Sequence, residues 1–451
     1  MKNMKRFLSG ALTAGILVLS APAHAIQIDL NFNFDPNIDP ALANDARQGF
    51  EKAARFWETR LKDDTTIILD VGFAPLAPNV IGQTGSSSAV VNYSVFRDAL
   101  AADQTSGKDK VAVQNLVQDD SLSFFTNTLG TFDGGPGISF DSAGNSVFST
   151  IDNTALDVNT ANLKALGFTG LDGVVDGSVT FNSDFEFDFN RSDGIDANAF
   201  DFIGVAAHEI GHALGFVSGV DFVDQFTGAG PTAEFVRDVV EDPANADFFR
   251  ALLGLPADAV ITRDILANVN IFEIVNAVFN VPDNFNAVFS PMDLFRFSDL
   301  SFDGQGNFLG FDLTSHLGIN GPLTFDDFDT QFANRTDIPF FSFDGGKTQI
   351  APFSSGSFNG GFQFQFPDGT IIDLGGSQAS HLIEVFGVIS PFGIMDPTAG
   401  RGEQVDISAI DLAVFDVIGF DIPLPATVLF LGLGLIGFGA TQRRRQGHQA
   451  A

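Results

Sequence analysis

The 451-residue chain contains no cysteine, one tryptophan, one tyrosine and only 23 lysine and arginine residues against 56 acidic ones. The absence of cysteine excludes a disulfide-stabilised scaffold, thiolate catalysis and cysteine-ligated metals. A net charge of −33 argues against nucleic-acid binding, because phosphate contacts need clustered basic residues. Hydrophobic residues make up 45% of the chain, which is ample for a packed core. We therefore expect a folded, strongly acidic protein that self-repulsion keeps monomeric.

The N-terminus carries a targeting segment rather than part of the fold. Three basic residues within the first six precede an apolar run, and the small residues Ala23-His24-Ala25 close the segment. This pattern is typical of a secretory signal peptide. We therefore expect residues 1–25 to be removed on export and the mature chain to begin at Ile26.

The C-terminal residues form a second targeting segment. Pro423-Leu-Pro-Ala-Thr427 leads into an apolar stretch over residues 428–440, and three arginines follow it. Such a stretch would insert into a membrane with its arginines on the cytoplasmic side. The tail, residues 422–451, resembles the PEP-CTERM sorting signals of Gram-negative bacteria. The resemblance implies a transient anchor in the inner membrane, processing by sorting machinery, and delivery to the cell surface or exterior; a plain single-span anchor is the alternative.

The body between the two ends shows patterns of both helices and strands. Alternating apolar residues over 26–34, a helical stripe over 43–61 and a β-branched run over 65–73 predict a β-α-β opening with parallel strands. Further along, the patterns predict helices over residues 219–287 and strands with turns over residues 298–376. A closing helix is predicted over residues 407–418. Together these elements predict an α+β fold.

Over residues 179–189, one valine and four phenylalanines fall on one face of an extended chain, and Asp184, Glu186 and Asp188 fall on the other. The alternation predicts one half-buried strand with an acidic outer face. We expect this strand to be the edge against which an extended peptide would pair. Packing of its phenylalanines in the core is the alternative explanation.

The motif His208-Glu-Ile-Gly-His212 lies in an apolar helical segment that closes with Gly215. Two histidines four residues apart on a helix project from one face and can share one metal ion. Glu209 lies on the adjoining face, where a carboxylate can polarise a metal-bound water. Zinc is the expected metal, because imidazole suits it and it has no redox chemistry. The alternative is a pair of ordinary helix histidines that fit a short pattern by accident.

A catalytic zinc needs a third protein ligand and an open fourth position. His24 and His448 leave with the targeting segments, and carboxylates compete with the remaining histidines. Spacing alone leaves four candidates open, which are Asp221, Glu234, His316 and His381.

The run from His208 to Phe216 resembles the zinc signature of the metzincin proteases, in which Gly215 lets the chain turn away beneath the metal. Ile394-Met395-Asp-Pro397 resembles their Met-turn. In the usual metzincin the third ligand would fall at Ser218, whose hydroxyl serves poorly.

The leishmanolysin branch of that family carries its third histidine far downstream, in a Ser-His-Trp context shortly before the Met-turn. Gln378-Ala-Ser-His381 is similar to that arrangement, with Leu382 in place of the tryptophan. The resemblance therefore implies His208, His212 and His381 as zinc ligands, Glu209 as the catalytic base and Met395 as the Met-turn residue.

The resemblance also implies a zincin-like fold and a function. It implies an N-terminal zincin subdomain with the active-site helix over residues 26–218 and an inserted subdomain over residues 219–376. A last segment, residues 377–421, would carry the third ligand, the Met-turn and the closing helix. The implied activity is an exported zinc metalloendopeptidase, in which a zinc-bound water activated by Glu209 hydrolyses extracellular protein or peptide substrates.

Two other functions stay open. One is a zinc hydrolase of a non-peptide substrate, and the other is a cell-surface or matrix protein with a structural or vestigial metal. Glu209 favours catalysis, because a structural zinc does not need it. Some metzincins carry a tyrosine two residues after the Met-turn methionine, where this chain has Pro397, and that difference favours the non-enzyme.

A second metal is suggested by oxygen-bearing side chains at alternate positions around Gly194. These candidate Ca²⁺ ligands are Asp188, Asn190, Ser192 and Asp196. The spacing resembles a calcium loop, but no glutamate closes it. An acidic, solvated turn is the alternative.

Overall fold

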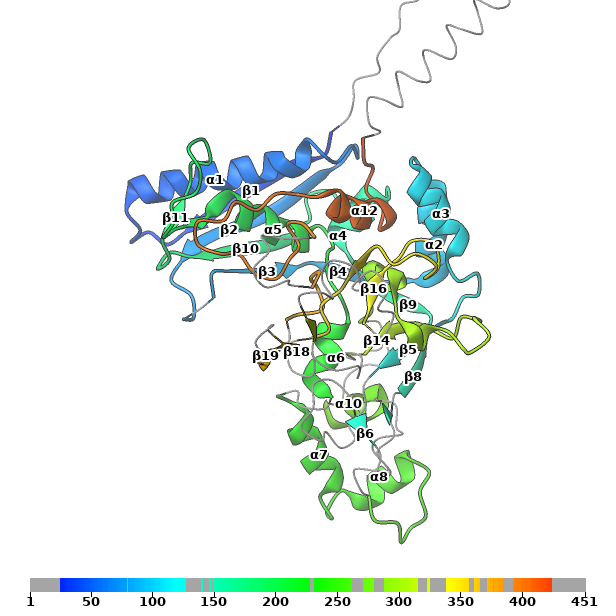
Figure 1. Ribbon diagram of the computed structural model, residues 1–451. Helices are drawn as coiled ribbons and strands as arrows, with labels where there is room; N and C mark the ends of the chain where they lie inside the picture. The colour runs from blue at the N-terminus through cyan, green and yellow to red at the C-terminus, as the bar shows by residue number, and fades with distance from the viewer. Residues whose placement is uncertain are drawn as a thin grey trace, which may run out of the picture.

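Helices and strands are mixed along the described part of the chain, so the fold is α+β, as predicted (Figure 1). The computed structural model describes residues 25–78, 80–126, 139–140, 146–147, 149–227, 231–261, 271–279, 288–314, 323–324, 338–356, 361–365, 371–375, 377–383 and 392–423. Nearly all of the predicted signal peptide and of the predicted sorting tail lies outside these residues. Within them, no helix is long and apolar enough to span a membrane.

A four-stranded sheet organises the N-terminal half, in the order β1 (Gln27–Phe34), β2 (Thr66–Ala74), β10 (Gly177–Asn182) and β3 (Gly82–Ser86). The first three strands run parallel, and β3 runs antiparallel to β10. Helix α1 (Pro40–Glu58) makes the crossover from β1 to β2. The predicted β-α-β opening with a parallel strand pair is therefore confirmed.

Helix α1 begins where the sequence provides a cap and buries one stripe of its surface. The Asp39 carboxylate accepts hydrogen bonds from the backbone N–H groups of Ala41 and Leu42, and Pro40 occupies the first helical position. Phe50 on the buried stripe packs edge-on against Phe181 of β10. This stripe covers one face of the sheet.

The prediction of a single edge strand over residues 179–189 is wrong. Strand β10 ends at Asn182, and the separate short strand β11 (Phe187–Asp188) pairs with β12 (Phe200–Asp201) in another sheet. Strand β10 also has neighbours on both sides, so it offers no edge, and β1 and β3 are the edge strands of this sheet. The alternative of core packing is confirmed at Phe181, which is fully buried.

Helix α5 (Phe202–Ala213) lies beside α1 on the same face of the sheet, since Phe202 also packs against Phe181. Its first turn is capped by Asp201, which accepts a hydrogen bond from Gly204 N and pairs with the guanidinium of Arg191. In its middle, the Ala207 carbonyl accepts a hydrogen bond of 2.8 Å from the indole of Trp57 on α1. These contacts fix the helix that carries the histidine motif.

The remaining elements surround this sheet or extend away from it. The helices are α2 (Tyr93–Ala102), α3 (Gly107–Asn115), α4 (Thr160–Ala165), α6 (Val220–Phe226), α7 (Ala233–Glu241), α8 (Ala246–Leu252), α10 (Ile271–Phe279) and α12 (Ala409–Val417), with 3-10 turns η2 (Pro291–Phe295) and η3 (Asp299–Ser301). The strands are β4 (Ser88–Asn92), β5 (Leu122–Thr126), β6 (Ser139–Phe140), β7 (Ser146–Val147), β8 (Ser149–Asn153), β9 (Ala155–Asn159), β13 (Arg296–Phe297), β14 (Phe311–Leu313), β15 (Leu323–Thr324), β16 (Phe340–Phe341), β17 (Ala351–Pro352), β18 (Gly361–Gln365) and β19 (Ile371–Gly375).

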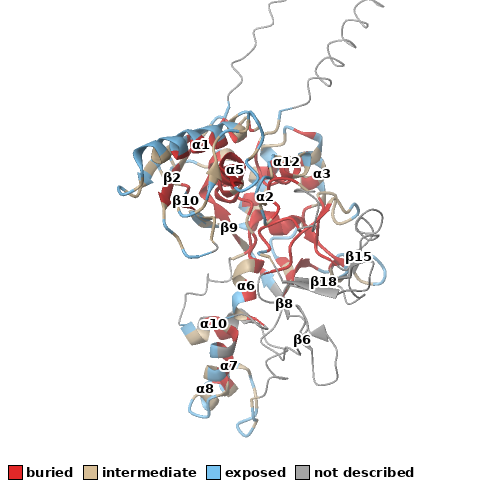
Figure 2. Cartoon of the chain, turned by 60° about the vertical axis from the view of Figure 1, so that its left-hand side comes forward, coloured by how far each residue is buried: buried red, intermediate tan, exposed pale blue. Residues whose placement is uncertain are grey.

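The helices predicted over residues 219–287 appear as α6, α7, α8 and α10, which extend downwards from the body in Figure 1, with α7 and α8 at the bottom. Helix α12 confirms the predicted closing helix. Buried residues concentrate in the upper body around α5, α2 and α12 (Figure 2). The predicted subdomain boundaries stay predictions.

Candidate metal centre

Three histidine side chains converge on one point between α5 and a loop near the C-terminus. His208 and His212 come from α5, and His381 comes from residues 377–383, here called the third-ligand loop. The His212 Nε2 atom lies 3.1 Å from both His208 Nε2 and His381 Nε2, and the remaining pair of Nε2 atoms is 3.2 Å apart. These residues, the histidine triad, are brought together from positions far apart in the chain.

The other ring nitrogen of each histidine faces a backbone carbonyl. The Nδ1 atoms of His208, His212 and His381 lie 2.6, 2.7 and 3.1 Å from three carbonyl oxygens, those of Ile394, Phe216 and Gln378. A carbonyl oxygen can only accept, so each Nδ1 donates its hydrogen. In a neutral ring this leaves a lone pair on Nε2.

Three lone pairs about 3 Å apart repel one another, and a shared cation removes the repulsion. Tetrahedral zinc with bonds of about 2.0–2.1 Å separates neighbouring nitrogens by about 3.3 Å, close to the observed spacing. The donated Nδ1–H bonds are the arrangement that orients metal-ligating histidines in general. The histidine triad therefore fits a zinc ion.

Burial keeps two of the rings neutral. It lowers the pKa of His212 to about 3, with a smaller contribution from the neighbouring His208, and lowers the pKa of His381 well below its ordinary value. Neutral imidazole is the form that binds a metal.

A glycine turn at the end of α5 supplies the carbonyl that orients His212. Gly215 has a φ of +118°, and Phe216 N donates a 3.1 Å hydrogen bond back to the Gly211 carbonyl. This is the Schellman pattern, which reverses the chain after a helix and requires a residue that tolerates positive φ. It returns the Phe216 carbonyl to the His212 ring.

Met395 lies beneath the histidine motif, fully buried. A side chain at Gly211 would come within 2.5 Å of the Met395 sulfur, so glycine is needed for this close approach. The carboxylate of Asp411, at the start of α12, accepts hydrogen bonds from the backbone N–H groups of Ile394 and Met395. The Met395 carbonyl accepts one from Leu382 N, which links the turn directly to the third-ligand loop.

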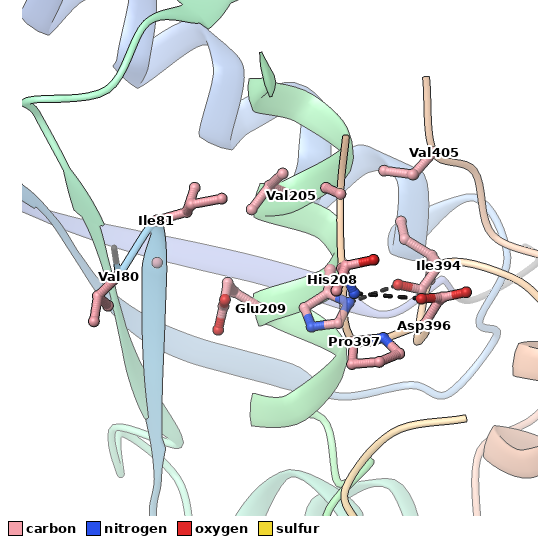
Figure 3. A pocket seen from close by; sticks show the side chains of 12 residues that line it. Val80, Ile81, Val205, His208, Glu209, Ile394, Asp396, Pro397 and Val405 are labelled. Carbon is pink, nitrogen blue, oxygen red and sulfur yellow. Dashed lines mark hydrogen bonds between the residues drawn. The ribbon is translucent and has the colours of Figure 1, made fainter. Parts of the chain in front are cut away.

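The side chain of Glu209 points towards β3 (Figure 3). Its carboxylate accepts a 2.6 Å hydrogen bond from the Thr84 hydroxyl. Gly82 on the same strand leaves room for this carboxylate, since a side chain there would lie 3.1 Å from the Glu209 Oε1 atom. Glu209 therefore lies between edge strand β3 and the histidines.

Two adjoining cavities open at this point. The larger, about 520 Å³, contains the histidine triad, Glu209 and residues of β3 on its walls. The smaller, about 300 Å³, lies between His208, Glu209 and the segment that follows Met395. Its walls include Ile81, Val205 and Pro397 (Figure 3). The histidines are thus reached from an open cleft with a side pocket whose walls are both polar and apolar.

Of the other candidates for a third ligand, only the Asp221 side chain lies among the described residues, and it bonds to the third-ligand loop. The Asp221 carboxylate accepts hydrogen bonds from Ala379 N, Ser380 N and the Ser380 hydroxyl, and burial raises its pKa to about 6. Glu234 belongs to α7, but its side chain lies outside the described residues, as does all of His316. Among the described His, Asp and Glu residues, the triad is the one group of three that could share a metal.

The candidate calcium residues form hydrogen bonds within their own turn. The Asp188 carboxylate accepts from Asn190 N and Asp196 N, and the Asn190 side-chain oxygen accepts from Ser192 N and Oγ. Such bonds organise a turn whether or not a cation is bound. The calcium site stays a prediction.

Sequence reasoning missed Thr84 and Asp411. Thr84 lies in a short Gly- and Ser-rich strand with no apolar alternation, so no pattern marks it. For Asp411 the sequence does contain a recognisable pattern, because Ser408 and Asp411 form a capping box at the start of α12. That signal predicts a helix start, but not the bonds to the Met395 turn.

Comparison with protein-family models gives a match at the C-terminal end of the chain. Residues 421–445 match the PEP-CTERM protein-sorting motif. The motif implies that the chain is exported and that sorting machinery, an exosortase, processes it. No curated protein and no solved structure matches the chain. The inner-membrane anchor stays a prediction, since the apolar stretch over residues 428–440 lies outside the described residues.

Proposed function

We propose that the chain is an exported zinc metalloendopeptidase with a zincin-like fold. The observation that carries the proposal is the convergence of three Nε2 lone pairs beside the carboxylate of Glu209, in an open cleft. A purely structural zinc site uses four protein ligands, whereas a catalytic site keeps a position open. Three histidines next to a base and a cavity support the catalytic arrangement.

The roles of the residues follow from their chemistry. His208, His212 and His381 would hold a zinc ion, which when bound supplies a Lewis acid that polarises a carbonyl and acidifies water. Glu209 accepts the proton of the attacking water and returns it to the leaving amine. The Thr84 hydroxyl holds the Glu209 carboxylate against β3 while the substrate binds.

The edge strand supports a peptide as the substrate. Strand β3 pairs with β10 on one side, and within the described residues its other side has no partner strand. It also forms a wall of the larger cavity. An extended peptide paired along β3 would therefore have its backbone beside the histidine triad and one side chain in the smaller pocket.

One observation favours the alternative of a surface protein with a vestigial metal. The single tyrosine of the chain, Tyr93, is fully buried in α2 and donates its hydroxyl to the Val117 carbonyl. It is therefore engaged in the core and is absent from the residues that form the walls of either cavity. No tyrosine hydroxyl is therefore available to help a bound metal stabilise the oxyanion.

The test compares wild type with Glu209→Gln, using full-length protein and an unfolded protein as the substrate. Zinc content is measured on the same samples. We expect wild type to cleave, Glu209→Gln to bind zinc equally but to cleave about 10²–10⁴-fold more slowly, and the exposed Glu51→Gln on α1 to match wild type. Zinc-loaded wild type that cleaves no peptide bond would refute the peptidase and leave the two alternatives.

A further inference from the structure

The third-ligand loop has no helix or strand of its own, so its position depends on contacts with other segments. On its C-terminal side, Ser354 N donates a 3.0 Å hydrogen bond to the His381 carbonyl, and Leu382 N donates a 2.9 Å bond to the Met395 carbonyl. These backbone bonds hold the chain at and after His381. On its N-terminal side, Gly356 N donates a 3.0 Å bond to the Ser377 carbonyl, so the residues directly before the histidine, Ala379 and Ser380, need a further support.

Asp221 provides that support with a single carboxylate. It lies in the first turn of α6, and one of its oxygens accepts from Ala379 N. The other oxygen accepts from both Ser380 N and the Ser380 hydroxyl. Three donors from two consecutive loop residues thus converge on one charged side chain, directly before the histidine.

Ser380 also connects the loop to the end of the histidine helix. Its hydroxyl oxygen accepts a 2.8 Å hydrogen bond from Ser218 N, and the Ser218 hydroxyl donates a 2.6 Å bond to Asp293. The same Asp293 carboxylate accepts from Gly219 N. Ser218, at the position where the third ligand of the usual arrangement would fall, here helps to hold the loop that presents His381.

We propose that Asp221 is a positioning residue for the third ligand, acting with Ser380 as a clamp on the loop before His381. The inference rests on the proposed metal site and deepens it. Metal ligands must be held within about 0.5 Å of their productive geometry, which a loop achieves only through supporting bonds. Without the clamp, the site reverts towards a two-histidine site on α5, with weaker and less tetrahedral metal binding.

The experiment measures metal binding of full-length protein in the absence of any substrate. Zinc affinity is obtained by competition with a chelator, and the absorption spectrum of the cobalt-substituted protein reports the ligand geometry. The variants are Asp221→Asn, Ser380→Ala and Ser380→Thr, with His381→Ala as the reference for a lost ligand. Asparagine preserves the shape of Asp221 but replaces one accepting oxygen with a donor.

The control for general destabilisation is Asp176→Asn. Asp176 is fully buried and accepts from three donors, namely Ile68 N, the Thr160 hydroxyl and the Lys164 ammonium, but it does not contact the third-ligand loop. Its substitution lowers stability without touching the clamp. Thermal unfolding of each metal-free variant gives the loss of stability against which zinc affinity is compared.

We expect Asp221→Asn and Ser380→Ala to weaken zinc binding about 10–100-fold and to shift the cobalt spectrum towards that of His381→Ala. Ser380→Thr, which keeps the hydroxyl, should restore most of the affinity, and Asp176→Asn should bind zinc like wild type. An Asp221→Asn variant with wild-type affinity and spectrum would overturn the proposal, as would an equal loss in Asp176→Asn. Zinc-loaded wild type without peptidase activity would overturn the proposed function but not the clamp.

Discussion

Replacing Gly215 by alanine tests how the fold builds the candidate metal centre. The turn at Gly215 has a φ of +118° and returns the Phe216 carbonyl to the His212 ring. A Cβ at this position would also collide with the side-chain amide of Asn162, a buried residue of α4 whose Nδ2 donates to the Ile418 carbonyl. Gly215→Ala therefore has two separate energetic costs, one from the backbone conformation and one from the collision with Asn162.

Both costs can be given a magnitude. An alanine held at positive φ loses about 1–2 kcal/mol relative to glycine. Displacing the Asn162 amide breaks its bond to the Ile418 carbonyl inside the core, which adds about 1–3 kcal/mol. We therefore expect Gly215→Ala to lower the free energy of unfolding of the metal-free protein by about 2–5 kcal/mol.

Gly167 offers a matched control. It ends α4 with the same hydrogen-bond pattern, in which Phe168 N donates to the Leu163 carbonyl, and it has a φ of +76°. A Cβ at Gly167 would meet nothing within 4 Å. Gly167→Ala should therefore show the backbone cost alone, about 1–2 kcal/mol.

The assay is urea unfolding of full-length, metal-free protein, combined with zinc affinity at neutral pH. A double-mutant cycle with Asn162→Ala isolates the collision, because the second substitution removes the amide that the new methyl group would strike. Zinc affinity should fall in Gly215→Ala and not in Gly167→Ala, since only the first displaces the carbonyl that orients His212. Equal unfolding energies for the two glycine variants, or a cycle with no coupling, would refute this reasoning.

Three further predictions concern pH, the metal and the side pocket. Burial raises the pKa of Asp63 from 3.8 to about 7, so its contribution to stability is fully present below pH 3.8 and is lost as the pH rises through 7. Asp63→Asn should therefore be more stable than wild type at pH 8, by up to about 4 kcal/mol, and should approach it near pH 4 in urea titrations. An equal difference at both pH values would contradict this. Zinc at 100 times its Kd should raise the free energy of unfolding by about 2.7 kcal/mol, measured against chelator-treated protein, and His212→Ala should abolish the rise. Val205→Phe should fill the smaller cavity and shift cleavage towards smaller side chains, which mass spectrometry of the products would detect; unchanged cleavage sites would exclude this pocket from specificity.

Local patterns in the sequence determined several parts of this protein. The β-α-β opening could be predicted because strand and helix periodicities are properties of short segments, and the parallel pairing of β1 with β2 follows from the helical crossover between them. The motif from His208 to His212 likewise has a fixed geometry, since residues four apart on a helix share a face. The sorting motif at the C-terminus was also readable from composition and order alone.

The tertiary structure decided the rest. Spacing left His381, Asp221, Glu234 and His316 open as candidates for the proposed third ligand, because each depends on how distant segments pack against the end of α5. The structure directs the His381 ring into the triad and turns Asp221 to the loop behind it. The position of β3 at the sheet edge beside the histidines was also beyond prediction, because β3 has no apolar alternation and its place depends on pairing with β10. Long-range contacts of this kind are set by register and burial across the whole sheet, which no short stretch of sequence contains.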